Sequence, residues 1–368
     1  MRRVQPHNYF IIIEYEPNCF HILTIVLIML KKDLLTLLEY TPDEIRGMLT
    51  LAAQLKARRR ADNARQTIDN TCVSSGGNIA GGGHAGNTGA AAAECLAGLP
   101  LAGKTAVMIF EKPSLRTRIS FETAIHELGG HVINLASESV GMGTRESVED
   151  VARNLERIVH LVVARTFAHE TLTKLAQFCR IPVINALTDM HHPCQALAFG
   201  LTMAEARPNK KLNIVFAGDG NNVCMSIMIL CAKLGYDFTL ACPAGYETDA
   251  DATQKCVDIC AETGGKLSIT NDIRAAVKHA DAIYTDVWAS MGQEAEAEKR
   301  KAVFPAYQVN KELLSQAPKD VLVSHCLPAR RGEEITCEIL DSSASVAYEE
   351  AENRLHVQKA VIVKLFGG

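Results

Sequence analysis

The sequence lacks an excess of charge of either sign. Its 368 residues include 38 Lys and Arg against 42 Asp and Glu, which gives a formal net charge of −4 at pH 7. A protein that binds a nucleic-acid backbone usually carries a clear basic excess. We therefore expect no nucleic-acid partner. Hydrophobic residues make up 48% of the chain, enough for a sizeable core, and this excludes global disorder.

Cysteine is present without a pattern that binds zinc or builds a disulfide framework. The 12 cysteines are spread over a long chain, far below the density of small stapled domains. No Cys-x-x-Cys pair occurs, and Cys256 with Cys260 has no second pair nearby. We expect reduced thiols, a cytoplasmic location and no metal.

The sequence also has no apolar run long enough to cross a bilayer, which takes about 20 residues. The run from Phe20 to Leu30 is too short, and Glu14 and Glu16 lie where a signal peptide is basic. We expect no membrane partner. Residues 1–32 are expected to be an extension outside the fold, with 1–28 either upstream sequence or a loose appendage.

Two open parallel sheets are expected in the rest of the chain, after an insertion at 62–98 that is rich in small residues and that we expect to be flexible. Beyond Ala102, apolar runs rich in Val and Ile alternate with segments of helical period, which indicates βαβ units. A second series of strands begins after the polar break at 207–211. Strands are expected at 105–110, 131–135, 160–164 and 182–184, then at 213–217, 238–241, 282–285 and 321–324, with helices at 147–159 and 193–206.

This pattern predicts an α/β protein with two domains, each an open parallel sheet flanked by helices. We expect the first domain at 33–185 and the second at 186–343, with a final helical segment at 344–368 that packs back on the first. Ligands bind outside the carboxyl ends of such strands. An interdomain cleft is therefore the expected site.

The first candidate motif, Ser114 to Arg118, follows an expected strand and opens a helix through about Leu128. A helix N-terminus offers free N–H groups and a positive dipole end, and the motif adds two hydroxyls and two guanidiniums. This combination suits a phosphate dianion. A capping Ser followed by solvated arginines would have the same sequence.

The second motif, His191 to Gln195, opens the helix at 193–206. Adjacent side chains on such a turn point apart, which argues against a shared metal. A single His can instead donate to a developing oxyanion, with Gln195 near an amide or amine. A structural role for a lone His is the alternative.

Three further motifs follow expected strands of the second domain. Gly218 to Asn222 resembles a dinucleotide-binding turn but lacks its third glycine and the ribose-binding acid, so Asn222 remains available to a polar substrate. Asp286 to Gly292 and His325 to Pro328 lie at the expected cleft. Helix capping by Asp286 and burial of an inert Cys326 thiol are the structural alternatives.

Together these motifs resemble the ornithine branch of the aspartate/ornithine carbamoyltransferase family, from about Asp33 to the C-terminus apart from the insertion. Ser-x-Arg-Thr-Arg is typical of the whole family, whereas Asp-x-x-x-Ser-Met-Gly and His-Cys-Leu-Pro are typical of the ornithine branch. Leu115 departs from the Thr often found there, and the extension and the insertion depart as well.

The resemblance implies a site for each substrate. Carbamoyl phosphate would be held by Ser114, Leu115, Arg116, Thr117, Arg165, His192, Gln195, Cys326, Leu327 and Arg354, and L-ornithine by Asn222, Asp286, Ser290 and Met291. Within this set the resemblance gives the chemical roles to Arg116, Arg165, His192 and Cys326.

The implied reaction forms L-citrulline and phosphate, as in arginine biosynthesis or the urea cycle, by direct attack of the side-chain amine without cofactor, metal or covalent intermediate. A homotrimer or a multiple of trimers is the implied assembly. Putrescine or aspartate as the amine, and a non-catalytic subunit that binds phosphate ligands, are the alternatives. The Ser-Met-Gly stretch argues against the first, and the presence of Arg116, His192 and Cys326 against the second.

Overall fold

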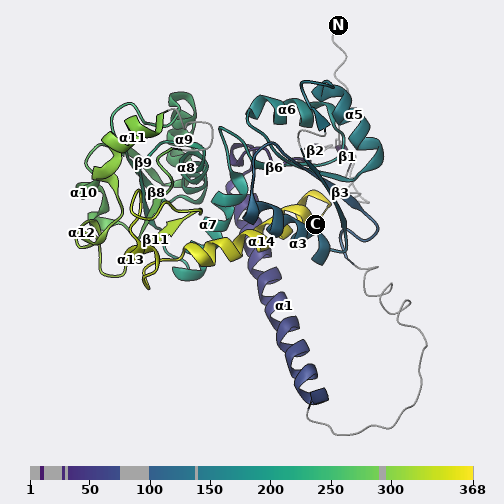
Figure 1. Cartoon of the computed structure of the whole chain (residues 1–368), viewed down its shortest axis with the longest axis horizontal. Coiled ribbons are helices and arrows are strands. Elements are labelled where there is room, and N and C mark those ends of the chain that lie inside the picture. The colour runs from purple at the N-terminus through teal and green to yellow at the C-terminus, as the bar shows by residue number, and fades with distance from the viewer. Residues whose placement is uncertain are drawn as a thin grey trace, which may run out of the picture.

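The computed structural model describes residues 9–11, 27–29, 32–74, 99–136, 140–289 and 296–367. Two parallel sheets dominate this part of the chain (Figure 1). The four-stranded sheet has the order β4 (His131–Ala136), β3 (Thr105–Phe110), β5 (Leu161–Arg165) and β6 (Val183–Leu187). The five-stranded sheet has the order β11 (Leu322–His325), β10 (Ala282–Thr285), β7 (Asn213–Ala217), β8 (Asp237–Ala241) and β9 (Lys266–Thr270). The expected fold class is confirmed.

Helices flank both sheets, and two of them lie between the sheets (Figure 1). The helices of eight or more residues are α1 (Pro42–Ser74), α3 (Leu115–Glu127), α5 (Val148–Ile158), α6 (His169–Phe178), α7 (Pro193–Ala206), α8 (Asn222–Leu234), α9 (Ala250–Thr263) and α14 (Ala347–Leu365). Shorter helices are α10 (Ile273–Ala276), α11 (Ala297–Val303), α12 (Lys311–Leu314) and α13 (Cys337–Leu340). Among the described helices none is long and apolar enough to cross a membrane.

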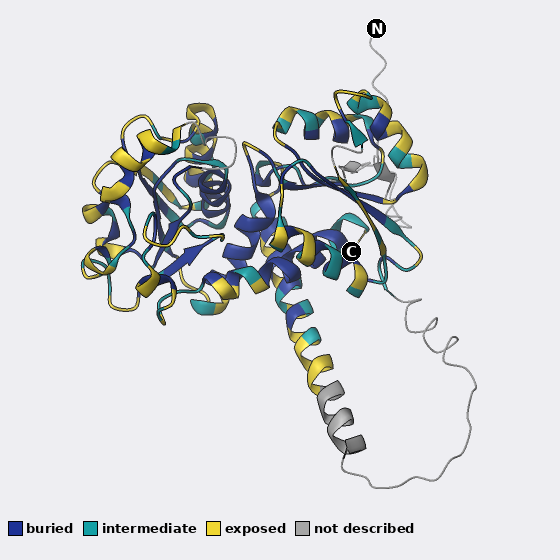
Figure 2. Cartoon of the chain, viewed as in Figure 1, coloured by how far each residue is buried: buried dark blue, intermediate teal, exposed yellow. Residues whose placement is uncertain are grey.

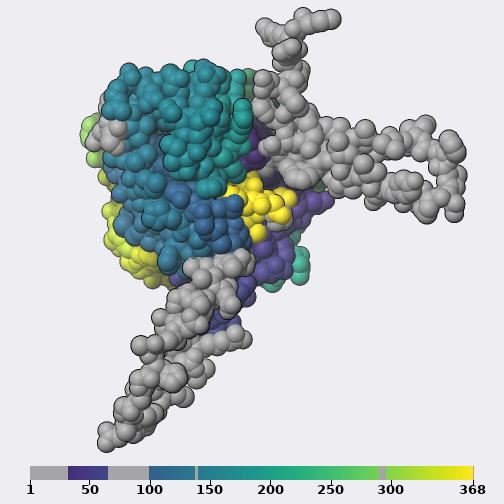
Figure 3. Space-filling model, turned by 90° about the vertical axis from the view of Figure 1, so that its right-hand side faces the viewer, coloured from purple at the N-terminus to yellow at the C-terminus, as the bar shows by residue number. Residues whose placement is uncertain are grey.

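The two halves share one core. Helices α7 and α14 lie between the sheets (Figure 1), and they are buried over most of their length (Figure 2). One apolar cluster includes Met108 of β3, Phe216 of β7 and Val361 of α14. On the face shown in Figure 3, the C-terminal end of the chain emerges between the first half and α1. The last helix therefore links both halves of the molecule.

The structure differs from the expected elements in two places. The insertion expected from residue 62 is wrong for residues 62–74, which continue α1, while 75–98 lie outside the described residues. Residues 61–64 of this helix are exposed, and the sequence that follows has no apolar period to reveal a helix. Strand β9 was not expected, because it is a half-exposed edge strand with polar residues.

At the N-terminal end, Lys32 lies against the body of the protein, where its Nζ donates to the Ala176 carbonyl at 2.9 Å. Strands β1 (Tyr9–Ile11) and β2 (Leu27–Met29) pair antiparallel with each other. The assignment of 1–32 to an extension outside the fold stays a prediction.

Candidate active site

The first part of the site is the N-terminus of α3, which follows β3. Ser114 is the N-cap residue, yet its hydroxyl makes no capping bond to the helix. It accepts a long hydrogen bond from Arg165 Nη1 at 3.4 Å instead. The first turn of α3 therefore keeps its N–H groups and positive dipole end available to an anion. The side chain of Leu115 is 69% exposed.

Three guanidiniums gather beside this helix end: Arg116 on α3, Arg165 at the end of β5 and Arg354 on α14. The Nε atom of each is buried without a hydrogen-bond partner, and no described carboxylate forms an ion pair with any of them. Burial, followed by the charges of Arg354 and Arg116, lowers the pKa of Arg165 to about 10. Clustered positive charge with so little compensation is what a doubly charged anion stabilises.

Arg354 is held by two side chains at the starts of α3 and α7. Its Nη1 donates to Gln195 Oε1 at 2.7 Å and its Nη2 donates to Thr117 Oγ1 at 2.8 Å. All three residues are buried. The last helix therefore supplies one cation of the cluster and connects the starts of α3 and α7.

His192 is the N-cap residue of α7, and Pro193 follows at the first helical position. Its backbone N–H donates to Ser226 Oγ at 2.7 Å, while the buried Nδ1 has no partner. Burial, and then the charges of Arg354, Arg165 and Arg116, hold the pKa of His192 well below its ordinary value. The ring is therefore neutral at pH 7, and a neutral imidazole donates one hydrogen bond without adding a fourth positive charge.

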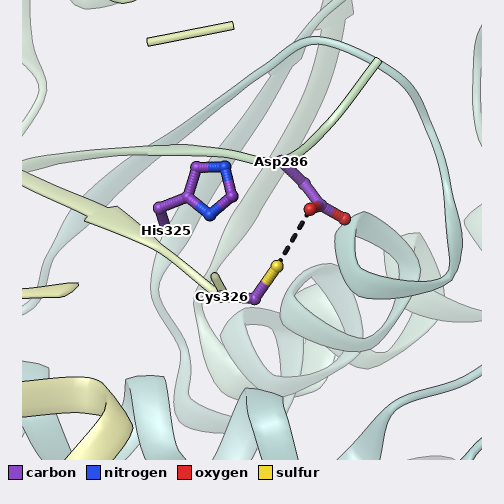
Figure 4. A group of neighbouring side chains, drawn as sticks. All are labelled: Asp286, His325 and Cys326. Carbon is purple, nitrogen blue, oxygen red and sulfur yellow. Dashed lines mark hydrogen bonds between the residues drawn. The ribbon is translucent and has the colours of Figure 1, made fainter. Parts of the chain in front are cut away.

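The second part of the site lies where β10 and β11 end. Asp286 follows β10 and Cys326 follows β11, and Cys326 Sγ donates to Asp286 Oδ1 at 2.9 Å (Figure 4). Asp286 also accepts from Asn221 Nδ2 and from the Val287 backbone N–H, both at 2.8 Å. Burial and the Asp286 carboxylate raise the pKa of Cys326 well above its ordinary value, so the sulfur is a thiol.

Asp286, His325 and Cys326 bring three ligand atoms within 4.8 Å of one another, the one such group among the described residues. The ring of His325 is already committed on both sides, however. Its Nδ1 accepts from the Leu327 backbone N–H at 2.8 Å and its Nε2 contacts Glu334 Oε1 at 2.9 Å. A metal at this position would have to displace one of these bonds, so the group is poorly prepared as a cation site.

These two parts lie close enough to act on each other, because the Asp286 carboxylate acts to raise the pKa of Arg116. That pKa is nevertheless lowered, chiefly by burial. A further residue near the junction, Leu327, has a backbone φ of 56°. This conformation is strained for a Leu, and such strain often occurs at functional sites.

A cavity of about 650 Å³ adjoins the second part of the site, and Asn221, Asn222 and His191 are among its lining residues. Asn222 lines it while its Nδ2 donates to the Thr188 carbonyl at 2.6 Å. None of the three clustered arginines lines this cavity. Ser290 and Met291, both expected to bind the amine substrate, lie outside the described residues.

Comparison with known proteins identifies the family in both halves of the chain. Residues 32–205 match the model of the aspartate/ornithine carbamoyltransferase carbamoyl-P binding domain, and residues 210–365 match that of the Asp/Orn binding domain. The chain belongs to the aspartate/ornithine carbamoyltransferase family. The resemblance inferred from the motifs is thus confirmed.

Relatives within the carbamoyltransferase family match over nearly their whole length. The ornithine carbamoyltransferase of Pyrococcus horikoshii is 43% identical over 92% of this chain and 96% of its own. That of Halalkalibacterium halodurans is 44% identical over 95% and 99%. The solved structure of ornithine carbamoyltransferase from Pyrococcus furiosus aligns with a TM-score of 0.79 at 42% identity, over 91% of this chain and 97% of that one.

Two polar residues of this carbamoyltransferase site were missed by sequence reasoning. Asn221 caps α8 through its Oδ1 and binds Asp286 through its Nδ2. Glu350 is completely buried beneath Gln195. A signal for the second was present, because Glu350 stands one helical turn before Arg354 and therefore shares its helix face.

Proposed function

We propose that the chain transfers the carbamoyl group of carbamoyl phosphate to the side-chain amine of L-ornithine, giving L-citrulline and phosphate. The carrying observation is the cluster of Arg116, Arg165 and Arg354 at the start of α3, without described counter-ions and beside the Asp286 and Cys326 pair. One half supplies positive charge for a phosphate. The other supplies a carboxylate for an ammonium group.

Carbamoyl phosphate binds in the first half. Ser114, Arg116 and the N–H groups of the helix start stabilise the phosphate as it leaves, with the backbone of Leu115 contributing. Thr117, Arg165 and His192 polarise the carbonyl oxygen. Gln195, Cys326, Leu327 and Arg354 complete this site.

Ornithine binds against the second half. Asp286 pairs with the α-amino group, Asn222 holds the carboxylate, and Ser290 and Met291 complete the site. Cys326 lies beside the reactive amine. Asp286 and Asn222 are hydrogen-bonded within the protein before ornithine arrives, so binding replaces these bonds with bonds to the substrate.

The chemistry needs no covalent nucleophile, because carbamoyl phosphate is already an activated acyl donor. The ammonium group first releases a proton to solvent, and the lone pair of the neutral amine attacks the carbonyl carbon. The new C–N bond forms, charge develops on the carbonyl oxygen, and the C–O bond to phosphate then breaks with its electron pair on the leaving phosphate, which accepts the second proton of the attacking nitrogen. Positioning and electrostatic stabilisation of both charges drive the reaction, without a metal.

The assembly is proposed to be a homotrimer or a multiple of trimers. The exposed face of α3 and the neighbouring edge strand β4 support an interface, because Leu115, Ile119 and Ile133 are 69%, 55% and 38% exposed. An uncovered edge strand with apolar neighbours is a usual place for association. Light scattering of the purified protein gives the mass that tests this.

The domain limits remain proposals as well: 33–185 for carbamoyl phosphate, 186–343 for ornithine, and 344–368 packing back. A cytoplasmic location and a role in arginine biosynthesis complete the proposal, supported by the nine described cysteines, all of them free. Deletion of residues 1–28 is expected to leave folding and turnover intact. A drop of more than about 5 °C in Tm on this deletion would show that the segment packs on the core.

Turnover with three amines tests the reaction itself. Purified protein with carbamoyl phosphate and ornithine is expected to release citrulline and phosphate in equal amounts, with and without a chelator. Putrescine and aspartate, offered separately, are expected to react weakly. Preference for either of them, or activity lost in chelator and restored by zinc, would contradict the proposal.

A further inference from the structure

One buried carboxylate of the protein contacts a residue of the proposed carbamoyl phosphate site without being assigned to either substrate itself. Glu350, near the start of α14, is 0% exposed. It accepts hydrogen bonds from Gln195 Nε2 on α7, from Tyr284 OH on β10 at 2.8 Å, and from Ser324 Oγ on β11. Three donors from three elements therefore meet at one side chain.

These partners are suited to an ionised carboxylate rather than to a neutral acid. Burial holds the pKa of Glu350 above its ordinary value, although the three hydrogen bonds oppose this shift by stabilising the carboxylate. A carboxylate only accepts hydrogen bonds, so each of the three partners must donate to it. Losing any of them would leave the buried charge less well solvated.

The chemistry of the partners also decides which way the Gln195 amide faces. A guanidinium only donates, and a carboxylate only accepts. Gln195 lies between Arg354 and Glu350, so its oxygen must face Arg354 and its nitrogen must face Glu350, as the structure has it. Arg354 held in this way reaches Thr117 Oγ1 with its other terminal nitrogen.

The same carboxylate is tied to the amine half. Tyr284 lies on β10 two residues before Asp286, and Ser324 lies on β11 two residues before Cys326. A continuous chain of hydrogen bonds therefore runs from the strands that end at Asp286 and Cys326, through Glu350, Gln195 and Arg354, to Thr117 at the start of α3.

We propose that Glu350 is a positioning residue: it fixes the Gln195 amide, and through it the Arg354 guanidinium, relative to the strands that carry Asp286 and Cys326. This inference rests on the proposed function, since Arg354 is assigned to carbamoyl phosphate there. Glu350 touches no substrate. Its effect is to hold the cation of α14 in register with both halves before either substrate binds, so that less ordering is left to the binding step.

The test removes donors from Glu350 and leaves Glu350 itself in place. Tyr284→Phe/Ser324→Ala leaves the carboxylate with Gln195 alone, while the ring at 284 keeps its packing on Phe199 and Phe216. A buried carboxylate with one donor takes up a proton more readily. The protonated acid donates to the Gln195 oxygen, which turns the amide and presents its nitrogen to Arg354.

The matched control removes another buried hydrogen bond between α7 and α14. Thr202 Oγ1 accepts from Asn353 Nδ2 at 2.9 Å, one residue before Arg354, and makes no bond to Glu350 or Gln195. Thr202→Val therefore weakens the packing of α14 on α7 without changing the chain of hydrogen bonds that passes through Glu350. Melting temperature is measured for every variant, so that loss of packing is separated from loss of positioning.

The readouts are the Kd of inorganic phosphate by calorimetry and steady-state kinetics with both substrates. We expect the double variant to weaken phosphate binding and lower kcat/KM for carbamoyl phosphate by at least about tenfold, a loss of about 1.4 kcal/mol in transition-state stabilisation. Thr202→Val is expected to stay within about twofold in both. Equal losses in the two variants, or an unchanged phosphate Kd in the double variant, would overturn the proposal.

Glu350→Gln gives a second measurement if the double variant folds poorly. Its amide oxygen can accept from Gln195 and Tyr284 while its nitrogen donates to Ser324, so phosphate affinity is expected within about threefold of the parent. A tenfold loss in this variant would show that net charge, not hydrogen-bond geometry, is what matters, and would overturn positioning. Because phosphate binding is measured without an amine, these outcomes remain readable even if ornithine is not the substrate.

Discussion

The two halves of the site differ in how they stand before any substrate binds. In the phosphate half, the Nε atoms of Arg116, Arg165 and Arg354 are buried without partners and the cluster has no described counter-ion. In the amine half, Asp286 is satisfied by Asn221, Val287 and Cys326. The phosphate half has unpaired donors ready for an anion. In the amine half, the carboxylate is already hydrogen-bonded within the protein.

This difference teaches where binding energy is gained and where it is exchanged. An anion entering the cluster relieves repulsion among like charges and satisfies unpaired donors, so it stabilises the folded protein directly. An ammonium group reaching Asp286 must replace protein hydrogen bonds of similar strength. Amine affinity therefore depends more on selective contacts than on stored charge.

The largest effect is expected from Arg116→Ala. It removes a charge-assisted contact to the leaving phosphate and should lower kcat/KM about a thousandfold, or about 4 kcal/mol. Arg118 is the matched control, because it lies on the same helix as Arg116 but is exposed. Its guanidinium lies over the ring of Phe110, the last residue of β3. Arg118→Ala should change kcat/KM less than about threefold. A loss below about tenfold for Arg116→Ala would show that Arg116 is only a solvated charge on the helix and does not contact the leaving phosphate.

The next effect is a pH dependence of the free energy of unfolding, and it arises from His191. Burial, followed by the charge of His169, lowers the pKa of His191 to about 4. In the unfolded chain this His binds a proton near pH 6.5, so its share of the free energy of unfolding is present above that pH. This share is lost as pH falls toward 4, by up to about 3 kcal/mol.

Denaturant unfolding of wild type and His191→Gln across pH 7 to 4 measures that share. The stability difference between the two proteins should shift against the wild type as pH falls. A difference that stays constant over this range would show that His191 titrates normally in the folded state.

Amine selectivity tests the amine half. Asp286→Asn should lower kcat/KM for ornithine by at least a hundredfold, about 2.7 kcal/mol, because the α-ammonium group loses its charged partner. The weak rate with putrescine, which has no α-amino group beside a carboxylate, should change much less. Equal losses for the two amines would place Asp286 on the shared reactive end or in the fold.

The smallest expected effect is the stabilisation of the fold by each ligand alone, which compares the two halves of the site directly. Inorganic phosphate at about ten times its Kd should stabilise the fold by about 1.4 kcal/mol. Ornithine alone, at the concentration of phosphate used, should raise Tm less. The reverse order in a thermal scan would show that the amine half, not the arginine cluster, is the prepared one.

Much of the fold was predictable because its strands are short, apolar and separated by helices. The strands at 105–110, 213–217 and 282–285 and the helix at 193–206 have their expected bounds. Strand β9 was missed because an edge strand with one exposed side lacks a continuous apolar run. The outer part of α1 was missed because its sequence has no apolar period.

The site was predictable where a motif places polar groups at a strand end. The other contacts of the site could not be predicted, because they join residues that lie far apart in the sequence. The bond from Arg354 to Thr117 joins residues 237 positions apart, and no spacing rule reports such a contact. Glu350 shares a helix face with Arg354, but its contacts could not be predicted, since its three partners lie on three other elements. The assignments of Ser290 and Met291 remain predictions.

Helix α14 gives the protein a dependence on the order in which its parts assemble. Arg354 and Glu350 follow every other element of the site in the chain, and the core between the sheets includes Val361 of the same helix. A chain whose other elements have formed but whose α14 is undocked has two sheets and only two of the three clustered cations. Phosphate affinity is therefore a measure of completed folding, and a cell that supplies phosphate ligands favours finished molecules over half-assembled ones.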